Sequence, residues 1–186
     1  MDYDNVLKER RCTRVFSTKK VSFDKIIEIC ESARMAPMAG NIYTLKLVLV
    51  SEKAKKQELA EAALGQEFIA DANHVLVVCS DTSELKRSYG SRAEIYARQQ
   101  AGAAIENMFL KAVDLGLGTC WIGAFDENAV KRIINAPDTV QIEAMLPVSY
   151  AASPGKEAKK KPDLKMILHF EKWGQKVMKK PKEAVP

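Results

Sequence analysis

AEIYARQQAGAAIENMFLKAVDLG, residues 93–116, is the longest stretch of this sequence that predicts a helix. Its apolar residues recur at alternating spacings of four and three, which places them in one continuous seam along a helix. The seam consists of Ala101, Ile105, Met108, Ala112 and Leu115. Gly102, Ala103 and Ala104 add a face of small residues, which allows another helix to approach closely. We therefore expect this helix either in the domain core or at a subunit interface.

The segments around this helix alternate between short helical patterns and short strand patterns. Apolar stripes at helical spacing predict helices over residues 2–10, 22–37, 52–64 and 126–136. Alternating or continuous apolar runs predict strands over residues 45–51, 74–80 and 139–151, and a short strand with a turn over 118–125. After a loop over 153–162, order is expected to resume at 163–173. Because helices separate the few strands without a regular βαβ order, an α+β layered domain is favoured over a doubly wound sheet.

Single residues mark several element ends and exclude one motif. Ser22 or Asp24 can cap the helix over 22–37, and Pro37 is expected to end it. Asp126 suits the N-cap of the helix that follows it. Gly116-Leu-Gly118 follows a helix and precedes a strand, and Trp121 stands where a dinucleotide-binding loop needs its third glycine. A Rossmann-type loop is therefore excluded.

The length and charge of the chain limit the classes of protein that it can be. With 186 residues and 47% hydrophobic content, it can form one domain with a substantial core. We expect that domain over residues 1–174 and a basic tail over 175–186. The net charge of +5 is concentrated in residues 156–186, which hold ten lysines and four acidic residues. Because the rest of the chain is close to neutral, a general nucleic-acid surface is not expected.

The cysteines and the first residues indicate a reducing compartment. The four cysteines are widely spaced and form no CxxC pair, which argues against a zinc site and against a disulfide scaffold. No apolar run approaches the roughly 18 residues of a membrane span. The N-terminal ten residues are polar, so no secretory signal is expected. A cytoplasmic protein without membrane association is therefore expected.

The segment ERRCTRVF, residues 9–16, concentrates positive charge, with Arg10, Arg11 and Arg14 in five positions. Guanidinium groups match phosphate oxygens two at a time, so these arginines either bind an anionic ligand or belong to a solvated helix end. Cys12 could be a nucleophile, but a small residue that lets the backbone approach a ligand is the favoured interpretation. His74 begins a predicted strand, where a structural role is expected. The absence of a clear acid, base, nucleophile or metal cluster is typical of proteins whose bound organic cofactor carries the reaction.

Several motifs together resemble the nitroreductase family of FMN-dependent oxidoreductases. ERRCTRVF resembles the family's R-R-S-x-R-x-F opening, and SARMAPMAGN (32–41) resembles its A-x-x-A-P-S-x-x-N segment. QAGAAIENMFLKAVDLGLGTCWIGAF (100–125) is similar to the family's central helix and its G-L-G-T-x-W-I-G-x-F turn. LPVSYA and KKKPDLKMILHFEKW resemble the closing segment, so the resemblance extends in register over about residues 6–174.

This resemblance implies a fold, an assembly and a reaction. The fold would be α+β, with a central, mostly antiparallel sheet flanked by helices. The assembly would be an obligate homodimer with two FMN sites at the interface, built from both subunits. NADH or NADPH would reduce FMN and leave, and a nitro, quinone or related small organic acceptor would then occupy the same pocket in a ping-pong mechanism. The FMN carries the chemistry in such proteins, so no catalytic side chain is implied.

Matched by position, the resemblance also implies the residues that hold FMN. Arg10 and Arg11 would bind the phosphate and ribityl region, with Lys160 as a further phosphate partner. Cys12 stands where the family has serine and would contribute its backbone. Arg14 would lie beside the pyrimidine side of the ring, where its charge would stabilise the negative charge of the reduced flavin.

Two further groups of residues would line the flavin ring. The group contributed by the other subunit would be Pro37, Met38 and Asn41. The group that places backbone amides near the reactive ring nitrogen would be Ile122, Gly123 and Ala124, with the Gly123 backbone tuning the ring.

The sequence departs from the family pattern beside the ring. Met38 replaces a serine, Asn-Ile-Tyr-Thr-Leu at 41–45 replaces N-x-Q-P-W, and Gln100 stands where aspartate is common. None of these changes removes a phosphate ligand, so FMN binding is still expected, while the acceptor pocket is expected to differ. Two other functions stay open. One is a non-catalytic flavin-binding sensor or carrier, and the other is binding of nucleic acid or an acidic partner through the lysine-rich tail.

Overall fold

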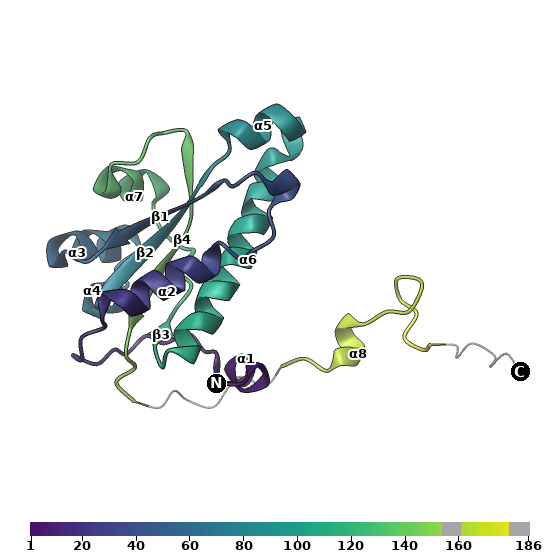
Figure 1. Cartoon of the computed structure of the whole chain (residues 1–186), viewed down its shortest axis with the longest axis horizontal. Helices are drawn as coiled ribbons and strands as arrows, with labels where there is room; N and C mark the ends of the chain where they lie inside the picture. The colour runs from purple at the N-terminus through teal and green to yellow at the C-terminus, as the bar shows by residue number, and fades with distance from the viewer. Residues whose placement is uncertain (154–160, 179–186) are drawn as a thin grey trace, which may run out of the picture. The chain divides into compact units, whose positions relative to one another are not determined.

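The computed structural model describes residues 1–153 and 161–178, and the chain divides into two units, 1–156 and 157–186 (Figure 1). The helices of the first unit are α1 (Tyr3–Glu9), α2 (Phe23–Ala33), α3 (Lys53–Ala62), α4 (Phe68–Asp71), α5 (Ser83–Tyr89), α6 (Ala93–Asp114) and α7 (Glu127–Ile134). Its strands are β1 (Leu45–Val50), β2 (His74–Asp81), β3 (Gly118–Thr119) and β4 (Val140–Ser149). Two short 3-10 turns, η1 (Ala39–Asn41) and η2 (Gly90–Arg92), complete the unit.

The strands form one antiparallel sheet in the order β1-β2-β4-β3. Leu76 in β2 pairs with Leu49 in β1 and with Leu146 in β4, so β2 lies inside the sheet. The register between β2 and β4 shifts between Val78 and Cys79. The predicted α+β class with a central antiparallel sheet is therefore confirmed.

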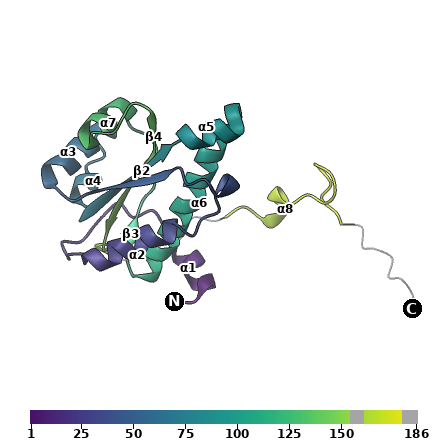
Figure 2. The same cartoon turned by 45° about the horizontal axis from the view of Figure 1, so that its top comes forward.

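Each face of the sheet carries its own hydrophobic core, because successive side chains of a strand point to opposite faces. Leu76 and Val78 pack with apolar residues of α2 and α6. Val75 and Val77 pack on the opposite face with residues of α3, α4 and α7. Figure 2 shows α3 and α7 on one side of the sheet and α2 with α6 on the other. The fold is thus a sheet between two layers of helices.

The long helix α6 confirms the predicted seam. Ala101, Ile105, Met108 and Ala112 are all buried, and Leu115 lies half-buried just beyond the helix. The seam packs against α2 and against the sheet, so the expected place in the domain core is confirmed. Gly102 and Ala103 are half-buried, and the role of these small residues at a subunit interface stays a prediction.

Some element ends differ from the sequence prediction. The prediction that Pro37 ends α2 is wrong, because the helix ends at Ala33 and the chain tightens into hydrogen bonds between residues three apart over 34–36. Ser22 occupies the N-cap position but makes no side-chain hydrogen bond to the helix. Asp126 does cap α7, since its carboxylate accepts a hydrogen bond of 3.0 Å from a first-turn amide.

Of the shorter elements, two helices were missed and one strand was predicted. The helices α4 and α5 were not predicted, since each is one or two turns long and lacks a clear apolar stripe. The short strand with a turn predicted over 118–125 is confirmed, with the strand at Gly118–Thr119 and a following turn in which Ile122 forms a bridge with Met145. A segment as short as β3 carries too few residues for its pattern to set its end.

The described part of the second unit contains one short helix, α8 (Leu164–Ile167), within the segment 163–173 that was expected to be ordered. Several apolar side chains of this unit are exposed, namely Leu164, Met166, Ile167 and Trp173. The predicted boundary after residue 174 falls inside this unit and stays a prediction. Among the residues described, no helix combines the length and apolar character that crossing a membrane requires.

Candidate functional site

The arginine-rich segment lies alongside β3. Cys12 forms a parallel bridge with Thr119, and the Thr13 amide donates a hydrogen bond of 2.8 Å to the Thr119 carbonyl. Further along, the Ser17 amide donates to the Tyr150 carbonyl at 2.8 Å. These backbone contacts hold residues 12–17 extended along β3 and the end of β4. The ERRCTRVF motif is therefore packed against the turn motif that begins at Gly116.

Gly118 makes this close packing possible. A Cβ atom at position 118 would lie 2.6 Å from Thr13 Oγ1 and 2.8 Å from Thr13 Cβ, far closer than such atoms approach in proteins. The Thr13 side chain is β-branched and has little rotamer freedom with which to move aside. A residue without a side chain at 118 therefore lets the arginine segment reach the strand.

Two arginines of this segment, Arg10 and Arg14, have weak or exposed contacts. Arg10 is the C-cap of α1, and its Nε lies 3.5 Å from Glu106 Oε1. Both groups are partly exposed, and pairs of this kind contribute about 0–1 kcal/mol, so Arg10 can exchange Glu106 for another anion. Arg14 is exposed, with its guanidinium carbon 5.9 Å from the centre of the Phe68 ring. Arg11 is half-buried, and Lys160 lies outside the described residues, so its phosphate role stays a prediction.

The turn after β3 presents unused backbone donors. Ile122 fixes the turn, because its amide and its carbonyl both pair with Met145 at 3.0 Å. Gly123 and Ala124 follow and are exposed. Within residues 1–153 and 161–178, neither of their amides donates a hydrogen bond. The turn therefore offers two free N–H groups close to the strand on which the arginine segment lies.

A buried hydroxyl lies between these two parts of the site. Thr119 is 4% exposed, and its Oγ1 has no hydrogen-bond partner in the part of the chain that the structure describes. Leaving a buried polar group unpaired costs about 1–3 kcal/mol, so a ligand atom or a water that bonds to this hydroxyl would be stabilising. Sequence reasoning did not single out Thr119, and the one available signal was its place in the GTCW turn.

The site also contains two cysteines. Cys12 is exposed, whereas Cys120 is fully buried. Burial raises the pKa of the Cys120 thiol to about 12, and the neighbouring Cys12 thiol acts in the same direction. With this pKa, Cys120 is a protonated and unreactive thiol at neutral pH.

The residues expected to line the ring from the other subunit lie in a different part of the unit. The segment 37–41 is held near the start of α6, because Ala39 packs on a cluster that contains Ala97. Arg10 lies near Glu106, nine positions further along α6, which corresponds to about 14 Å along the axis. Figure 1 shows η1 beside the α5 end of α6 and β3 beside the opposite end. Within one chain, the structure therefore does not bring the 37–41 segment next to the arginine segment.

The 37–41 segment is held in a tight turn by an aromatic neighbour. Gly40 and Asn41 both have a φ of 58°, in the left-handed region. A Cβ atom at Gly40 would lie 2.5 Å from the Tyr89 hydroxyl, so Tyr89 packs directly on this glycine. Tyr89 also lies edge-on to Tyr96, with ring centres 5.2 Å apart. Sequence reasoning missed both tyrosines, because only the packing of α5 and α6 makes them neighbours of Met38 and its segment.

Two of the departures from the family pattern are in direct contact. The Thr44 hydroxyl donates a hydrogen bond of 2.8 Å to Gln100 Oε1, and both side chains are buried. The other polar atom of the amide, Gln100 Nε2, has no partner among the described residues. The replacement at Gln100 and the replacement at Thr44 are therefore coupled. Met38, the third departure, is half-buried against the core.

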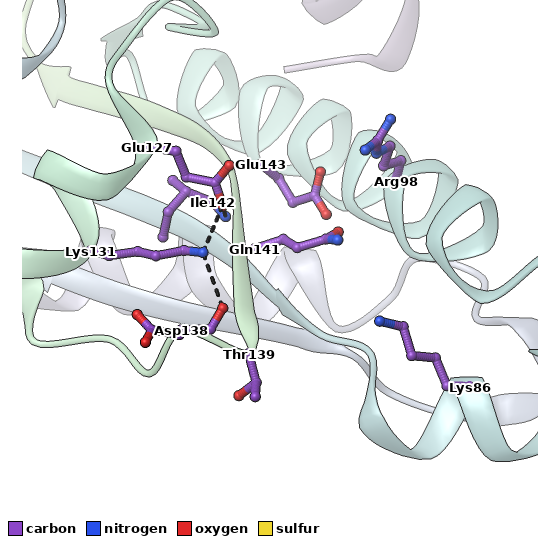
Figure 3. Close-up of a pocket in the computed structure, with 9 residues that line it drawn as sticks. All are labelled: Lys86, Arg98, Glu127, Lys131, Asp138, Thr139, Gln141, Ile142 and Glu143. Atoms are coloured by element: carbon purple, nitrogen blue, oxygen red, sulfur yellow. Dashed lines mark hydrogen bonds and ion pairs between the residues drawn. The ribbon is translucent and has the colours of Figure 1, made fainter. Parts of the chain in front are cut away.

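A polar cavity of about 470 Å³ opens between α5, α6, α7 and the start of β4 (Figure 3). Its lining consists of Lys86, Arg98, Glu127, Lys131, Asp138, Thr139, Gln141, Ile142 and Glu143. Lys131 is paired with Glu127 at 3.1 Å, and burial raises the pKa of Glu143. None of the predicted cofactor-binding residues lines this cavity. The cavity is therefore separate from the candidate site.

Comparison with known proteins identifies relatives of the chain. The model of the nitroreductase family matches residues 7–73 and 62–150. An oxygen-insensitive NADPH nitroreductase from Helicobacter pylori is 29% identical over 177 residues, which cover 75% of this chain and 84% of that protein. An FMN reductase (NADPH) from Bacillus subtilis is 26% identical over 144 residues, which cover 70% of this chain and 58% of that protein.

A solved structure extends the similarity to the fold. The crystal structure of a nitroreductase family protein from Clostridium novyi NT matches with a TM-score of 0.75 at 27% identity. The match covers 94% of this chain and 96% of that protein. The family model spans the arginine segment, the central helix and the turn after β3, which are the parts that the structure packs together. The chain belongs to the nitroreductase family.

Proposed function

We propose that this protein is an FMN-dependent oxidoreductase that uses NADH or NADPH to reduce nitro compounds, quinones or related small organic acceptors. The observation that carries this proposal is the packing of residues 12–14 against Gly118 and Thr119. It sets a cluster of arginines beside a turn with free backbone amides. Membership of a family that includes an NADPH nitroreductase and an FMN reductase supports the same reaction class.

The residues at this place fit the chemistry of FMN. Its phosphate is an anion, which suits the forked guanidinium groups of Arg10 and Arg11. Its flat ring carries acceptor atoms, which suit the exposed and unused amides of Gly123 and Ala124. The unpaired Thr119 hydroxyl is a further polar group at the same place. Arg10 has only a weak, partly exposed contact, and within the described residues the Thr119 hydroxyl and the two amides have no hydrogen-bond partner.

In this proposal, the protein side chains bind and orient, and the cofactor reacts. FMN, when bound, would supply the redox chemistry that transfers electrons from the nicotinamide to the acceptor. Arg10 gives up its weak contact with Glu106 and binds the phosphate with Arg11. Arg14 would lie beside the pyrimidine side of the ring, where a cation would favour the reduced, negatively charged form. The donor and the acceptor use the same pocket in turn, which gives a ping-pong mechanism.

The proposed site needs a second copy of the chain. The 37–41 segment lies near Ala97, whereas the arginine segment lies near Glu106. Their separation of about 14 Å along α6 prevents both from touching one flavin ring within one chain. A homodimer in which Met38 and Asn41 of one copy approach Arg14 of the other would complete the site. The half-buried small residues of α6 are compatible with close packing of two such helices.

Flavin retention by arginine variants tests the assigned site. Arg10→Ala and Arg14→Ala should each weaken FMN binding roughly ten- to hundredfold, because a hydrogen bond to a charged group contributes about 1.5–3 kcal/mol. Arg132→Ala is the matched control, since Arg132 is exposed on α7 and lies outside the proposed site. The measurement is a titration of flavin-depleted protein with FMN, followed by absorbance. Unchanged affinity in both site variants would overturn the assignment.

Reduction of the bound flavin tests the activity. The purified protein should be yellow, and anaerobic NADH or NADPH should bleach its flavin bands. A specific observation favours a second candidate, a non-catalytic flavin carrier, because the apolar Met38 stands beside the expected ring position. Flavin bands that neither nucleotide bleaches would support the carrier and refute the reductase. A colourless protein that does not bind added FMN would refute both.

A further inference from the structure

The polar cavity between α5, α6, α7 and the start of β4 is lined by charges of both signs (Figure 3). Its charged residues are three cations and three carboxylates, namely Lys86, Arg98 and Lys131 with Glu127, Asp138 and Glu143. The formal charges therefore cancel. The volume of about 470 Å³ falls within the range of about 300–1,000 Å³ that is usual for small-molecule sites. The cavity thus suits a small molecule without net charge.

A β-bulge places Glu143 on this cavity. Ile142 pairs with Cys79 of β2, and Ala144, two positions later, pairs with the neighbouring Val78. Glu143 is therefore an extra residue of β4, and Ile142 and Ala144 pack in the two opposite cores. Bulges re-aim side chains and are frequent beside binding and active sites. Figure 3 shows the Glu143 side chain extending from β4 toward α6.

The floor of the cavity presents hydrogen-bond acceptors without donors. Glu143 Oε1 and Gln141 Oε1 are buried and have no hydrogen-bond partner among the residues described. Burial raises the pKa of the Glu143 carboxyl, while the Ser80 hydroxyl and the Arg98 charge act in the opposite direction. Ser80 Oγ makes no hydrogen bond of normal geometry in the part of the chain that the structure describes. Because unpaired buried acceptors are unfavourable, a group with several N–H donors would be bound by both oxygens.

Two cations lie across the cavity from these acceptors. Arg98, on α6, is exposed and makes no hydrogen bond or ion pair within residues 1–153 and 161–178. Lys86, on α5, lies 3.3 Å from Glu94, and both of these groups are about half exposed, so the pair is weak. In Figure 3, Arg98 and Lys86 lie to the right of Glu143 and Gln141. Both cations are therefore available to an anionic group.

The third cation belongs to the wall itself. Lys131 Nζ lies 3.1 Å from Glu127 Oε1 and donates a hydrogen bond of 3.2 Å to the Asp138 carbonyl. Glu127 Oε1 also accepts a hydrogen bond of 3.2 Å from the Ile142 amide. These contacts fix one wall of the cavity. A ligand would therefore interact with the opposite wall, where acceptors and cations face each other.

We propose that this cavity binds a small zwitterion that carries an ammonium group and a carboxylate and has the size of an amino acid or a dipeptide. The ammonium group donates hydrogen bonds to Glu143 and Gln141, and the carboxylate accepts from Arg98 and Lys86. A simple anion would be repelled by Glu143, and a simple cation would be repelled by Arg98. The binding is independent of the proposed function, because none of the residues assigned to FMN lines the cavity.

An NMR titration of the ¹⁵N-labelled full chain locates the site. Glycine and glycylglycine are the probes, and the one that binds more tightly shows which of the two sizes fits. Binding should shift the backbone amides of residues 139–143 and of Arg98. We expect a dissociation constant of about 1 mM or lower, as is usual for ligands with so few non-hydrogen atoms. N-acetylglycylglycine lacks the ammonium group and glycylglycinamide lacks the carboxylate, so each should bind about tenfold more weakly than glycylglycine.

Two variants test the assigned orientation of the ligand. Glu143→Gln keeps the shape of the side chain and should weaken glycylglycine binding about tenfold, with no effect on N-acetylglycylglycine. Arg98→Gln should weaken glycylglycine binding by a similar factor, with no effect on glycylglycinamide. Arg98 is exposed, so this variant should fold even if Glu143→Gln does not. The control is Arg132→Gln, because Arg132 is an exposed arginine of α7 outside the cavity, and it should bind all probes like the wild type.

Each outcome decides for or against the site. Absence of amide shifts at about twenty times the expected dissociation constant, where such a site is nearly saturated, would overturn the inference. Shifts confined to residues outside the cavity would also overturn it, as would equal affinities for the blocked and unblocked dipeptides. Wild-type affinity in Arg98→Gln would refute the assigned carboxylate partner. The titration detects the probe and not flavin, so a protein that binds no FMN would refute the proposed function and leave this result standing.

Discussion

Replacing Gly118 with alanine should push the arginine segment away from β3. The new Cβ atom would lie 2.6 Å from Thr13 Oγ1 and 2.8 Å from Thr13 Cβ. Rotation about χ1 can move Oγ1 but not Cβ, so the backbone of Thr13 has to shift. That shift lengthens the 2.8 Å hydrogen bond from the Thr13 amide to the Thr119 carbonyl. Gly118→Ala should therefore reduce both stability and the order of the site.

The expected size of the effect follows from three contributions. Overpacking of a tight contact costs about 1–3 kcal/mol. Weakening one backbone hydrogen bond costs about 1 kcal/mol. The lower conformational entropy of alanine in the unfolded chain offsets about 0.4–1 kcal/mol. The net loss is roughly 1–3 kcal/mol, which for a chain of this length corresponds to a decrease in Tm of roughly 3–10 °C.

The assay is thermal unfolding followed by circular dichroism, with FMN affinity as a second readout. Thr13→Gly removes the atoms that the new Cβ would meet, so it provides the matched control. The double variant Gly118→Ala with Thr13→Gly should be more stable than the sum of the two single effects, by at least about 1 kcal/mol. A Gly118→Ala protein that melts at the wild-type temperature and binds FMN as tightly would refute the close packing of the two motifs.

Three further changes test other contacts of the fold. Gly40→Ala should lower the free energy of unfolding by about 1–3 kcal/mol in urea titrations, because Gly40 has a φ of 58° and a Cβ there would lie 2.5 Å from the Tyr89 hydroxyl. Adding Tyr89→Phe removes that hydroxyl and should recover the part of the loss that comes from the clash. Asp126→Ala should cost about 1 kcal/mol through loss of the α7 cap, whereas Asp126→Asn should cost much less, and equal losses would contradict the capping role. Burial lowers the pKa of His74 below its ordinary value of 6.5, so the unfolded chain binds more protons and stability should fall as the pH drops from about 6.5 toward the folded pKa. In His74→Gln, urea titrations should show a smaller loss over this interval, and NMR titration of His74 in the wild type should give the lowered pKa.

Much of the secondary structure could be predicted from the sequence, because apolar periodicity reports which face of an element is buried. The seam from Ala101 to Ala112 predicted the long helix, and the alternation in residues 45–50 predicted the two faces of β1. The cap at Asp126 was also predictable, because a carboxylate at that position has one obvious donor to accept from. The end of α2 was not predictable, since a helix can stop before a proline without a residue that marks the place.

Some features of the candidate site could also be predicted from the sequence, whereas others could not. The residue types that could hold a flavin phosphate were visible as the cluster around Arg10, and the family motifs placed that cluster in a known context. The contact between Gly118 and Thr13 was not visible, because it joins segments more than a hundred positions apart. The unpaired Thr119 hydroxyl, the Tyr89 packing on Gly40 and the Thr44–Gln100 hydrogen bond are likewise properties of the packed chain.

By itself, the sequence determined the family, the sheet-and-helix composition and the arginine cluster, because each depends on residues that are neighbours or follow a local period. Only the tertiary structure decided that the arginine segment lies on β3 and that the 37–41 segment lies near the other end of α6. These relations depend on the register of strands and on the packing of helices across the sheet. Register is set by the simultaneous burial of many side chains, so no local pattern in the sequence records it.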